Sequence, residues 1–346
     1  MRAAIYSARP FEIPRLTRFA EAKGHELVFL EAGLNEHTAA LAEGFEVISP
    51  FVNDAVDASI VAKVAELSVK CFILRSTGFN NIDLDAADEH GICVARVPAY
   101  SPEAVAEHTV ALILTLNRKT HRAHARVREG NFSLEGLLGF NLHQRTIGVV
   151  GTGRIGLALC RILKGFGANV IASDPYPSDE ARELGVRYVS MEDLIAQSRI
   201  ISLNLPLTPE SHHLINDAAI ERMQDGVMLI NTSRGALVDT RAVIRGLKSG
   251  RIGSLGLDVY EEEGDLFFRD LSDTVIQDDV FARLLTFPNV IITGHQAFFT
   301  EEAVNRIAET TIENLEGYAR NGSPPKENIV MCGEHIAPEA EAAKGK

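Results

Sequence analysis

The chain has 346 residues, of which 46% are hydrophobic and 23% are charged, and its formal net charge is −13 at pH 7. This length exceeds what one hydrophobic core usually holds, so we expect a globular protein of two domains. The acidic balance and the lack of a long basic run argue against nucleic acid as a main partner. They argue equally against an anionic membrane surface. Local positive groups must therefore bind any anionic substrate.

The first 99 residues alternate short β-rich runs with helical patterns. A helical pattern, IPRLTRFAEAKG, ends at Gly24, as helices commonly do. The alternation predicts a parallel sheet with helices on both faces. The strand-like runs, rich in Val, Ile and Phe, are AAIYS, ELVFL, FEVIS, CFILR and ICVAR.

The N-terminal apolar run is too short for a signal sequence. The most apolar helical stretch, AVAEHTVALILTLNR, is interrupted by Glu107 and His108 and is too short to cross a bilayer. We therefore expect a soluble, cytoplasmic protein without a membrane partner. Four cysteines lie far apart with no CxxC pair, and we expect them to be buried thiols of a reducing compartment: Cys71, Cys93, Cys160 and Cys332.

The character of the chain changes at SPEAVAEH. Ser101 can act as a helix N-cap, and Pro102 suits the first helical turn. The helical pattern then runs to about residues 129–130. It is apolar on more than one face, which predicts packing against another domain or another subunit.

A second alternating series begins at Thr146, and its strand candidates are TIGVVG, ANVIASD, RYVS, RIISLNLP, VMLINTS, SLGLDVY and NVIITGH. The insert at 261–287 is too irregular for a plain crossover, and the last helix is EEAVNRIAETTIENLEGYARNG. After it, the tail EAEAAKGK is expected to be frayed. We expect one domain of residues 1–99 and 297–346, and a second domain of residues 100–296. Two crossings between these lobes predict a cleft there.

The motif GTGRIG, residues 151–156, follows an apolar strand and opens a helix. In that context Gly151 permits a tight turn, Gly153 lets a pyrophosphate approach the backbone, and Gly156 lets helix and strand pack closely. The next strand ends in Asp174, 18 residues after Gly156, where an acid accepts hydrogen bonds from the adenosine ribose and repels a 2′-phosphate. The motif therefore predicts NAD rather than NADP.

Arg234, Asp258 and His295 each follow or end an apolar strand of this second series. Ligands of open α/β sheets bind outside the carboxyl ends of the strands. The planar fork of Arg234 matches a carboxylate, while His295 can give or take a proton near neutral pH. We expect these groups to meet an anionic substrate; the alternative for Arg234 is a structural ion pair.

The other histidines and acids carry weaker signals. His121 and His124 are spaced i, i+3 on the long helix, but no carboxylate or cysteine cluster accompanies them, so we expect no metal site. His212 and His213 are expected at a helix start beside the cofactor. One glutamate of the run at 261–263 could reach His295 and stabilise its imidazolium form.

Together these residues resemble the D-isomer-specific 2-hydroxyacid dehydrogenase family, in particular its D-lactate dehydrogenase branch. The resemblance covers nearly the whole chain and rests on GTGRIG with Asp174, LNLPLTPES, INTSRGALVD, GLDVYEEE, GHQAFFT, EEEGDLFFRD, CFILRSTGFNNIDL and VPAYSPEAVAEHTV. It implies an α/β fold in which a Rossmann NAD-binding domain, residues 100–296, is inserted in a flavodoxin-like substrate or catalytic domain, residues 1–99 and 297–346. It also implies that Arg234 binds substrate, that His295 donates the proton, and that Glu263 supports His295. Gly264 stands where many members have proline, so Glu262 is the alternative.

The expected ligand contacts follow from these motifs. For the cofactor they are Gly151, Gly153, Arg154, Ile155, Gly156, Asp174, Leu205, Pro206, Ser211, Thr232, Ser233, Arg234 and Asp258. Backbone amides after the strand CFILR can hold a carboxylate, and bulky aromatics can limit the substrate side chain, although core packing is their alternative role. For the substrate the contacts are Phe51, Thr77, Gly78, Tyr100, Arg234, His295 and Phe298.

The resemblance implies the reversible reduction of pyruvate to D-lactate by NADH, in a homodimer or homotetramer. One alternative is a dehydrogenase for a larger 2-oxo acid, since the pocket residues decide substrate size. Another is an NAD-sensing corepressor-like binding protein, which would need a peptide-docking surface. No extended regulatory tail or basic arm accompanies the fold motifs, so the enzyme is the favoured interpretation.

Overall fold

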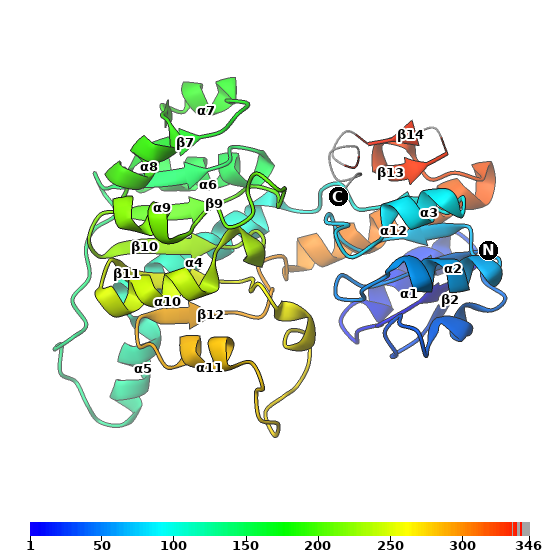
Figure 1. Cartoon of the computed structure of the whole chain (residues 1–346), viewed down its shortest axis with the longest axis horizontal. Helices are drawn as coiled ribbons and strands as arrows, with labels where there is room; N and C mark the ends of the chain where they lie inside the picture. The colour runs from blue at the N-terminus through cyan, green and yellow to red at the C-terminus, as the bar shows by residue number, and fades with distance from the viewer. Residues whose placement is uncertain (334, 338–339, 341–346) are drawn as a thin grey trace. The chain divides into compact units, whose positions relative to one another are not determined.

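A computed structural model describes residues 1–333, 335–337 and 340. The chain divides into two compact units, one of residues 1–101 with 299–346 and the other of residues 102–298 (Figure 1). These bounds lie two residues beyond those expected from the sequence. The tail expected to be frayed lies outside the described residues except for Ala340.

Unit 1, residues 1–101 with 299–346, contains a mostly parallel sheet. The strands follow the predicted runs: β1 (Arg2–Ile5), β2 (Glu26–Phe29), β3 (Val47–Ser49), β4 (Cys71–Ile73) and β5 (Cys93–Ala95). Their order, β2-β1-β3-β4-β5, is that of flavodoxin-like sheets. Two strands that the sequence did not predict extend the sheet beyond β5. β13 (Ile329–Cys332) pairs antiparallel with β5, and β14 (His335–Ile336) pairs antiparallel with β13.

Both faces of this sheet are covered. Successive residues of β1 point to different cores: Ala4 belongs to one hydrophobic cluster, whereas Ala3 and Ile5 belong to another. The predicted last helix, which ends at Gly322 in a left-handed conformation, contributes Ile312 to the second cluster. The helical segments of unit 1 are α1 (Ile13–Ala22), η1 (Ala39–Ala42), α2 (Ala58–Glu66), α3 (Leu84–Glu89), α12 (Glu301–Asn321) and η4 (Lys326–Asn328).

Unit 2, residues 102–298, contains a parallel sheet ordered β8-β7-β6-β9-β10-β11-β12, the arrangement of a Rossmann fold with one added strand. The order reverses between β6 and β9, which is where such sheets bind nucleotides. All of its strands overlap the predicted runs: β6 (Thr146–Val150), β7 (Asn169–Ser173), β8 (Arg187–Tyr188), β9 (Ile200–Leu203), β10 (Val227–Asn231), β11 (Ile252–Leu257) and β12 (Val290–Ile292). The predicted fold class, a Rossmann domain inserted in a flavodoxin-like domain, is confirmed.

The long helix predicted after Pro102 is interrupted. It forms α4 (Pro102–Arg118) and α5 (Thr120–Arg128), because Lys119 adopts a left-handed backbone conformation with φ of 50°. Much of the apolar surface of α4 is buried within unit 2, where the helix contacts α6 and β10. Packing of the remaining surface against another domain or subunit stays a prediction. The other helical segments of unit 2 are α6 (Arg154–Gly165), α7 (Asp179–Glu183), α8 (Met191–Gln197), α9 (Asp217–Arg222), η2 (Gly235–Leu237), α10 (Thr240–Ser249), η3 (Glu263–Asp265) and α11 (Asp279–Leu285).

The cysteine prediction was wrong for two of the four residues. Cys71 and Cys160 are buried free thiols, but Cys93 and Cys332 form a disulfide. The two come together because β13 pairs antiparallel with β5, and this pairing of segments more than 200 residues apart has no local sequence signal. Among the helices of the described residues, none is both long and apolar enough to cross a membrane.

Unit 1 also buries a charged pair at the carboxyl ends of its strands. Arg75, 5% exposed, donates to the carbonyl oxygens of Ser49 (3.0 Å) and Tyr6 (2.7 Å), and its Nε lies 3.1 Å from Oε2 of Glu12. Burial lowers the pKa of Arg75, while the nearby carboxylate of Glu12 opposes that effect. The guanidinium also lies over the Phe51 ring, 5.2 Å from its centroid. Glu12 therefore compensates a charge that water cannot reach.

We predict that Glu12→Gln destabilises the protein by about 3 kcal/mol, because breaking a buried ion pair leaves an uncompensated charge. Urea unfolding followed by circular dichroism measures the change. Glu36→Gln is the matched control, since Glu36 pairs with Lys63 at 3.1 Å on the exposed surface and such pairs contribute little. Equal stability of the two variants would contradict the compensating role of Glu12.

Candidate active site

The glycine motif forms the turn between β6 and α6 in unit 2. Gly151 has φ of 87°, and a methyl group on it would overlap the carbonyl oxygen of Asn204. A methyl group on Gly156 would overlap the carbonyl oxygen of Gly151, so helix and strand pack as closely as the motif predicts. Gly153, the N-cap of α6, has open space where its side chain would be. The helix amides, with Arg154 and Ile155 in the first turn, therefore face a region that can accept a phosphate group.

Asp174 follows β7 and turns toward this glycine turn. Its Oδ2 accepts from the backbone amide (2.6 Å) and the hydroxyl (2.9 Å) of Thr152, and its Oδ1 accepts from the amide of Tyr176 (2.8 Å). A carboxylate offers about four acceptor positions, so capacity remains for a ligand hydroxyl. The structure thus places Asp174 where the sequence predicted a ribose acceptor, and its binding role stays a prediction.

The loop after β9 contains Leu205, Pro206 and Ser211, three residues predicted to bind the cofactor. Ser211 is buried and shapes this loop: its hydroxyl donates to the carbonyl oxygen of Pro206 at 2.8 Å and accepts from the amide of Thr208 at 2.7 Å. Leu205 packs against the main hydrophobic cluster on that face. These contacts of Ser211 within the chain are structural, and the ligand contacts of all three residues stay predictions.

Arg234 sits on a turn at the end of β10, and that turn is held from both sides. The buried side chain of Asn231 donates to the carbonyl oxygen of Arg234 (2.8 Å) and accepts from the amide of Ser233 (3.0 Å). The Ser233 hydroxyl donates to Leu203, and the hydroxyl of Thr232 pairs with that of Thr109 on α4 (2.9 Å). Sequence reasoning missed Asn231, although its place at a strand end was visible.

The guanidinium of Arg234 is half-buried. Its Nη1 donates to the carbonyl oxygen of Ser233 at 2.7 Å, and no acid among the described residues lies within ion-pair distance. The alternative of a structural ion pair therefore finds no support in the described part of the chain. A carboxylate ligand would supply the missing negative charge.

Gly235 links this turn to the acidic segment after β11. A methyl group on Gly235 would overlap the backbone of Tyr260 and Glu261, so the two segments touch backbone to backbone. Burial, followed by a hydrogen bond to Asp278, raises the pKa of Tyr260, which stays neutral at physiological pH. Because Gly235 touches the backbone of Tyr260 and Glu261, the position of Arg234 is coupled to the segment that bears Glu263.

Glu263 and His295 form a hydrogen-bonded pair. Oε1 of Glu263 lies 2.8 Å from Nδ1 of His295, and Oε2 accepts from the amide of Tyr260 at 3.0 Å. His295 has a left-handed backbone with φ of 53°, and its Nε2 receives no hydrogen bond from the described residues. Glu262, the alternative partner, is exposed. The pair fits a proton donor whose orientation and charge are supported by a carboxylate.

Asp258 holds the loop on which His295 lies. Its buried carboxylate accepts from the Thr293 hydroxyl (2.5 Å) and from the amides of Gln296 and Ala297 (2.9 Å each). His108 on α4 approaches the same group, 3.4 Å from Oδ1. These contacts within the chain anchor the loop, and they were not foreseen from sequence; the predicted cofactor contact of Asp258 stays a prediction.

The predicted substrate residues of unit 1 lie at or after strand ends. Phe51 is buried, with Arg9 and Arg75 over its ring. The Thr77 hydroxyl donates to the carbonyl oxygen of Val97 at 2.8 Å, and the carbonyl of Gly78 accepts from Ser76. Tyr100 in unit 1 and Phe298 at the end of unit 2 are partly buried. The substrate contacts of these residues stay predictions.

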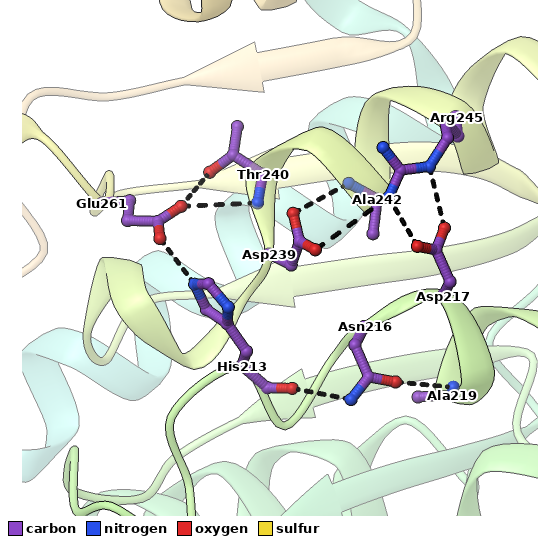
Figure 2. Close-up of polar contacts among 9 residues, drawn as sticks. All are labelled: His213, Asn216, Asp217, Ala219, Asp239, Thr240, Ala242, Arg245 and Glu261. Atoms are coloured by element: carbon purple, nitrogen blue, oxygen red, sulfur yellow. Dashed lines mark hydrogen bonds and ion pairs between the residues drawn. The ribbon is translucent and has the colours of Figure 1, made fainter.

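The helix start expected at His212 and His213 is instead a turn, because α9 begins only at Asp217 with Asn216 as its N-cap. His213 Nε2 lies 2.5 Å from Oε1 of Glu261 (Figure 2). Glu261 thus contacts His213, whereas Glu263, two residues later, contacts His295.

Residues 110–297 match the family model for the NAD-binding domain of D-isomer specific 2-hydroxyacid dehydrogenases. The chain is 52% identical to D-lactate dehydrogenase of Escherichia coli over 95% of its own length and 100% of that protein. It is also similar to solved structures. One, described as the pyruvate reductase of Chlamydomonas reinhardtii, has 46% identity and a TM-score of 0.87, covering 93% of this chain and 97% of that one. Another, D-lactate dehydrogenase from Aquifex aeolicus with NAD and lactic acid, has 35% identity and a TM-score of 0.86, covering 95% and 98%.

For Asp174→Ala we predict weaker NADH binding, by about 1–3 kcal/mol, because a charged acceptor is lost. NADPH binding should weaken less or improve, since repulsion of the 2′-phosphate is lost too. Fluorescence titration with both nucleotides measures the preference. Thr152→Val is the control, because it removes the hydroxyl that bonds Asp174 and keeps the carboxylate. An unchanged NADH-to-NADPH ratio in Asp174→Ala would rule out the ribose assignment.

Proposed function

The chain belongs to the D-isomer specific 2-hydroxyacid dehydrogenase family, and we propose that it is an NAD-dependent D-lactate dehydrogenase, which reduces pyruvate reversibly. The proposal rests on the hydrogen-bonded pair of Glu263 and His295. The same unit contains Arg234, which has no acidic partner among the described residues. That combination suits a substrate with a carboxylate beside a reducible carbonyl. The similarity to D-lactate dehydrogenases over nearly the whole chain supports pyruvate as that substrate.

NAD fits the residues of unit 2. The open side of Gly153 and the N-terminus of α6 would hold the pyrophosphate, and Asp174 would bind the adenosine ribose. When bound, NADH supplies the hydride for the keto carbon. We assign the remaining cofactor contacts to the loop after β9 and to the turn at Thr232 and Ser233, where the sequence placed them.

The substrate carboxylate binds Arg234 in this proposal. Its guanidinium offers a planar pair of donors, which can bind the carboxylate and polarise the neighbouring carbonyl. The Asn231 side chain fixes the backbone of the arginine, so the donors are positioned before substrate arrives.

His295 provides the proton. In the reductive direction the protonated imidazole donates from Nε2 to the developing alkoxide, and in the oxidative direction the neutral imidazole accepts it. Glu263, bonded to Nδ1, orients the ring and stabilises its charged form. Asp258 supports the contact between Glu263 and His295, because it fixes the backbone that follows His295.

Unit 1 contributes the remaining substrate contacts in this proposal. The backbone amides at Thr77 and Gly78 bind carboxylate oxygen. The side chains of Phe51 and Tyr100, with Phe298 of unit 2, limit the substrate to a small side chain such as a methyl group. These assignments rest on the positions after strand ends and on the family resemblance.

A second copy of the chain is the proposed partner, and the cytoplasm is the proposed location. Large apolar side chains are exposed near the end of α5 and in the segment that follows it: Val127 is 52% exposed, Phe132 74%, Leu134 82% and Leu138 88%. Exposed apolar side chains that gather into one patch commonly mark an interface, and these four lie within 12 residues of one another in the sequence. Whether two or four copies assemble is decided by light scattering of the purified protein.

A steady-state comparison of 2-oxo acids with NADH tests the proposed function. We expect the highest kcat/KM with pyruvate, lower values with branched or aromatic 2-oxo acids, and little activity with NADPH. If a larger 2-oxo acid gave the highest kcat/KM, that acid would take the place of pyruvate as the proposed substrate, and the proposed class of reaction would stand. No oxidation of NADH with any 2-oxo acid would contradict the enzymatic function itself and favour a binding protein.

For Arg234→Lys we predict a KM for pyruvate at least about 10-fold higher and a lower kcat, because one charge remains but the paired donors are lost. NADH affinity should change little. Arg245→Lys is the control, since Arg245 pairs with Asp217 on the exposed surface of the same unit. Normal pyruvate kinetics in Arg234→Lys would show that this arginine does not bind the substrate.

For Glu263→Gln we predict a kcat for pyruvate reduction lower by about 100-fold or more, a typical contribution of acid–base catalysis. Glutamine keeps the size of the side chain but removes the charge that stabilises the imidazolium. The KM for NADH should stay near the original value. Glu262→Gln changes an exposed neighbour with no contact to His295, and it should retain activity. Equal losses in both variants would argue against the specific role of Glu263.

A further inference from the structure

A second histidine–carboxylate group lies apart from the proposed proton donor. His212, His213 and Glu261 each offer a ligand atom, and these atoms all lie within 4.8 Å of one another. The two histidines come from the turn before α9, and the glutamate comes from the segment after β11. The group joins two loops that are 48 residues apart in the chain.

Its side chains are close but still reachable from solvent. Nε2 of His213 lies 2.5 Å from Oε1 of Glu261, and the rings of His212 and His213 stack with centroids 3.9 Å apart. The side chain of His213 is 34% exposed, that of Glu261 is 24% exposed, and His212 is exposed. An ion could therefore enter without opening the fold.

Surrounding contacts hold two of these ligands in place. The second oxygen of Glu261 accepts from the Thr240 hydroxyl at 3.0 Å at the start of α10 (Figure 2). The amide of His213 donates to the carbonyl oxygen of Ala236 at 2.8 Å, and its own carbonyl accepts from Asn216 at 3.1 Å. His213 has φ of 50°, a conformation that its neighbours must impose. Such supporting groups orient metal ligands and raise affinity.

We propose that His212, His213 and Glu261 bind a divalent transition-metal ion, of which Zn²⁺ is the representative. Two imidazole nitrogens and one carboxylate oxygen are ligands that Zn²⁺ accepts, with water in the fourth tetrahedral position. Mg²⁺ and Ca²⁺ prefer oxygen ligands and fit less well. Tetrahedral geometry places ligand atoms about 3.3 Å apart, so the ion would replace the direct His213–Glu261 hydrogen bond after a small side-chain rotation.

The competing interpretation is a plain hydrogen bond that ties the two loops together. It predicts no metal affinity above that of any exposed histidine. The pair on α5, His121 and His124, offers the matched comparison, because it is exposed and no third ligand of the described residues joins it. A metal bound at Glu261 would also restrain the segment that bears Glu263, two residues farther on.

The test is titration of the untagged, full-length protein with Co²⁺, followed by its visible d–d absorption, which is intense only when the ion is four-coordinate. We expect one equivalent to bind and Zn²⁺ to displace it. His212→Asn and Glu261→Gln should weaken binding by more than about 100-fold, since they remove ligands. Thr240→Val should weaken it by roughly 10-fold, as expected for a supporting group. His121→Gln should bind like the original protein.

Because His212 is exposed, its replacement leaves the fold intact and keeps the test valid if Glu261→Gln is unstable. Absence of a four-coordinate Co²⁺ spectrum in the original protein would overturn the proposal. So would unchanged binding in His212→Asn, or loss of binding only in His121→Gln, which would place the ion on α5. The readout does not depend on dehydrogenase activity, so failure here leaves the proposed function unaffected.

Discussion

The candidate site depends on the hydrogen bonds that the buried carboxylate of Asp258 accepts. At the end of β11 it accepts hydrogen bonds from Thr293 and from the amides of Gln296 and Ala297, so it fixes both sides of His295. Parallel strands make this possible, because their carboxyl ends meet at one edge of the sheet. With the loop fixed, the imidazole reaches Glu263, and the acidic segment in turn packs on Gly235 beside Arg234.

Much of the fold follows from local sequence. Every strand from β1 to β12 overlaps a predicted run, and most of these runs are apolar because buried parallel strands need continuous Val, Ile and Leu. The edge strand β8 (Arg187–Tyr188) is an exception, since its residues are exposed or partly buried. Two features had no such signal. β13 is short and pairs antiparallel with β5, which lies far away in the sequence, and β14 pairs antiparallel with β13. The pairing of β13 with β5 also brings Cys93 and Cys332 together in a disulfide. The helix break occurs at Lys119, which is neither a glycine nor a proline, so the residue type did not indicate a break.

The site was predictable in its residue types and less so in its connections. Strand ends indicated Arg234, Asp258 and His295. Residue types did not rank the three adjacent glutamates, and only the family resemblance favoured Glu263, with Glu262 as the alternative. Backbone geometry separates them: Glu261 meets His213, Glu262 is exposed, and Glu263 meets His295. The supporting contacts of Asn231 and Thr240 escaped prediction because they depend on which way a turn directs its side chains.

In the proposed reaction, NADH delivers hydride to one face of the keto carbon of pyruvate, and His295 donates the proton. The most direct measurement is the configuration of the product after the purified protein has consumed NADH and pyruvate, determined by chiral chromatography. We expect D-lactate in an amount equal to the NADH oxidised. Formation of L-lactate, of a racemic mixture, or of no lactate would contradict it.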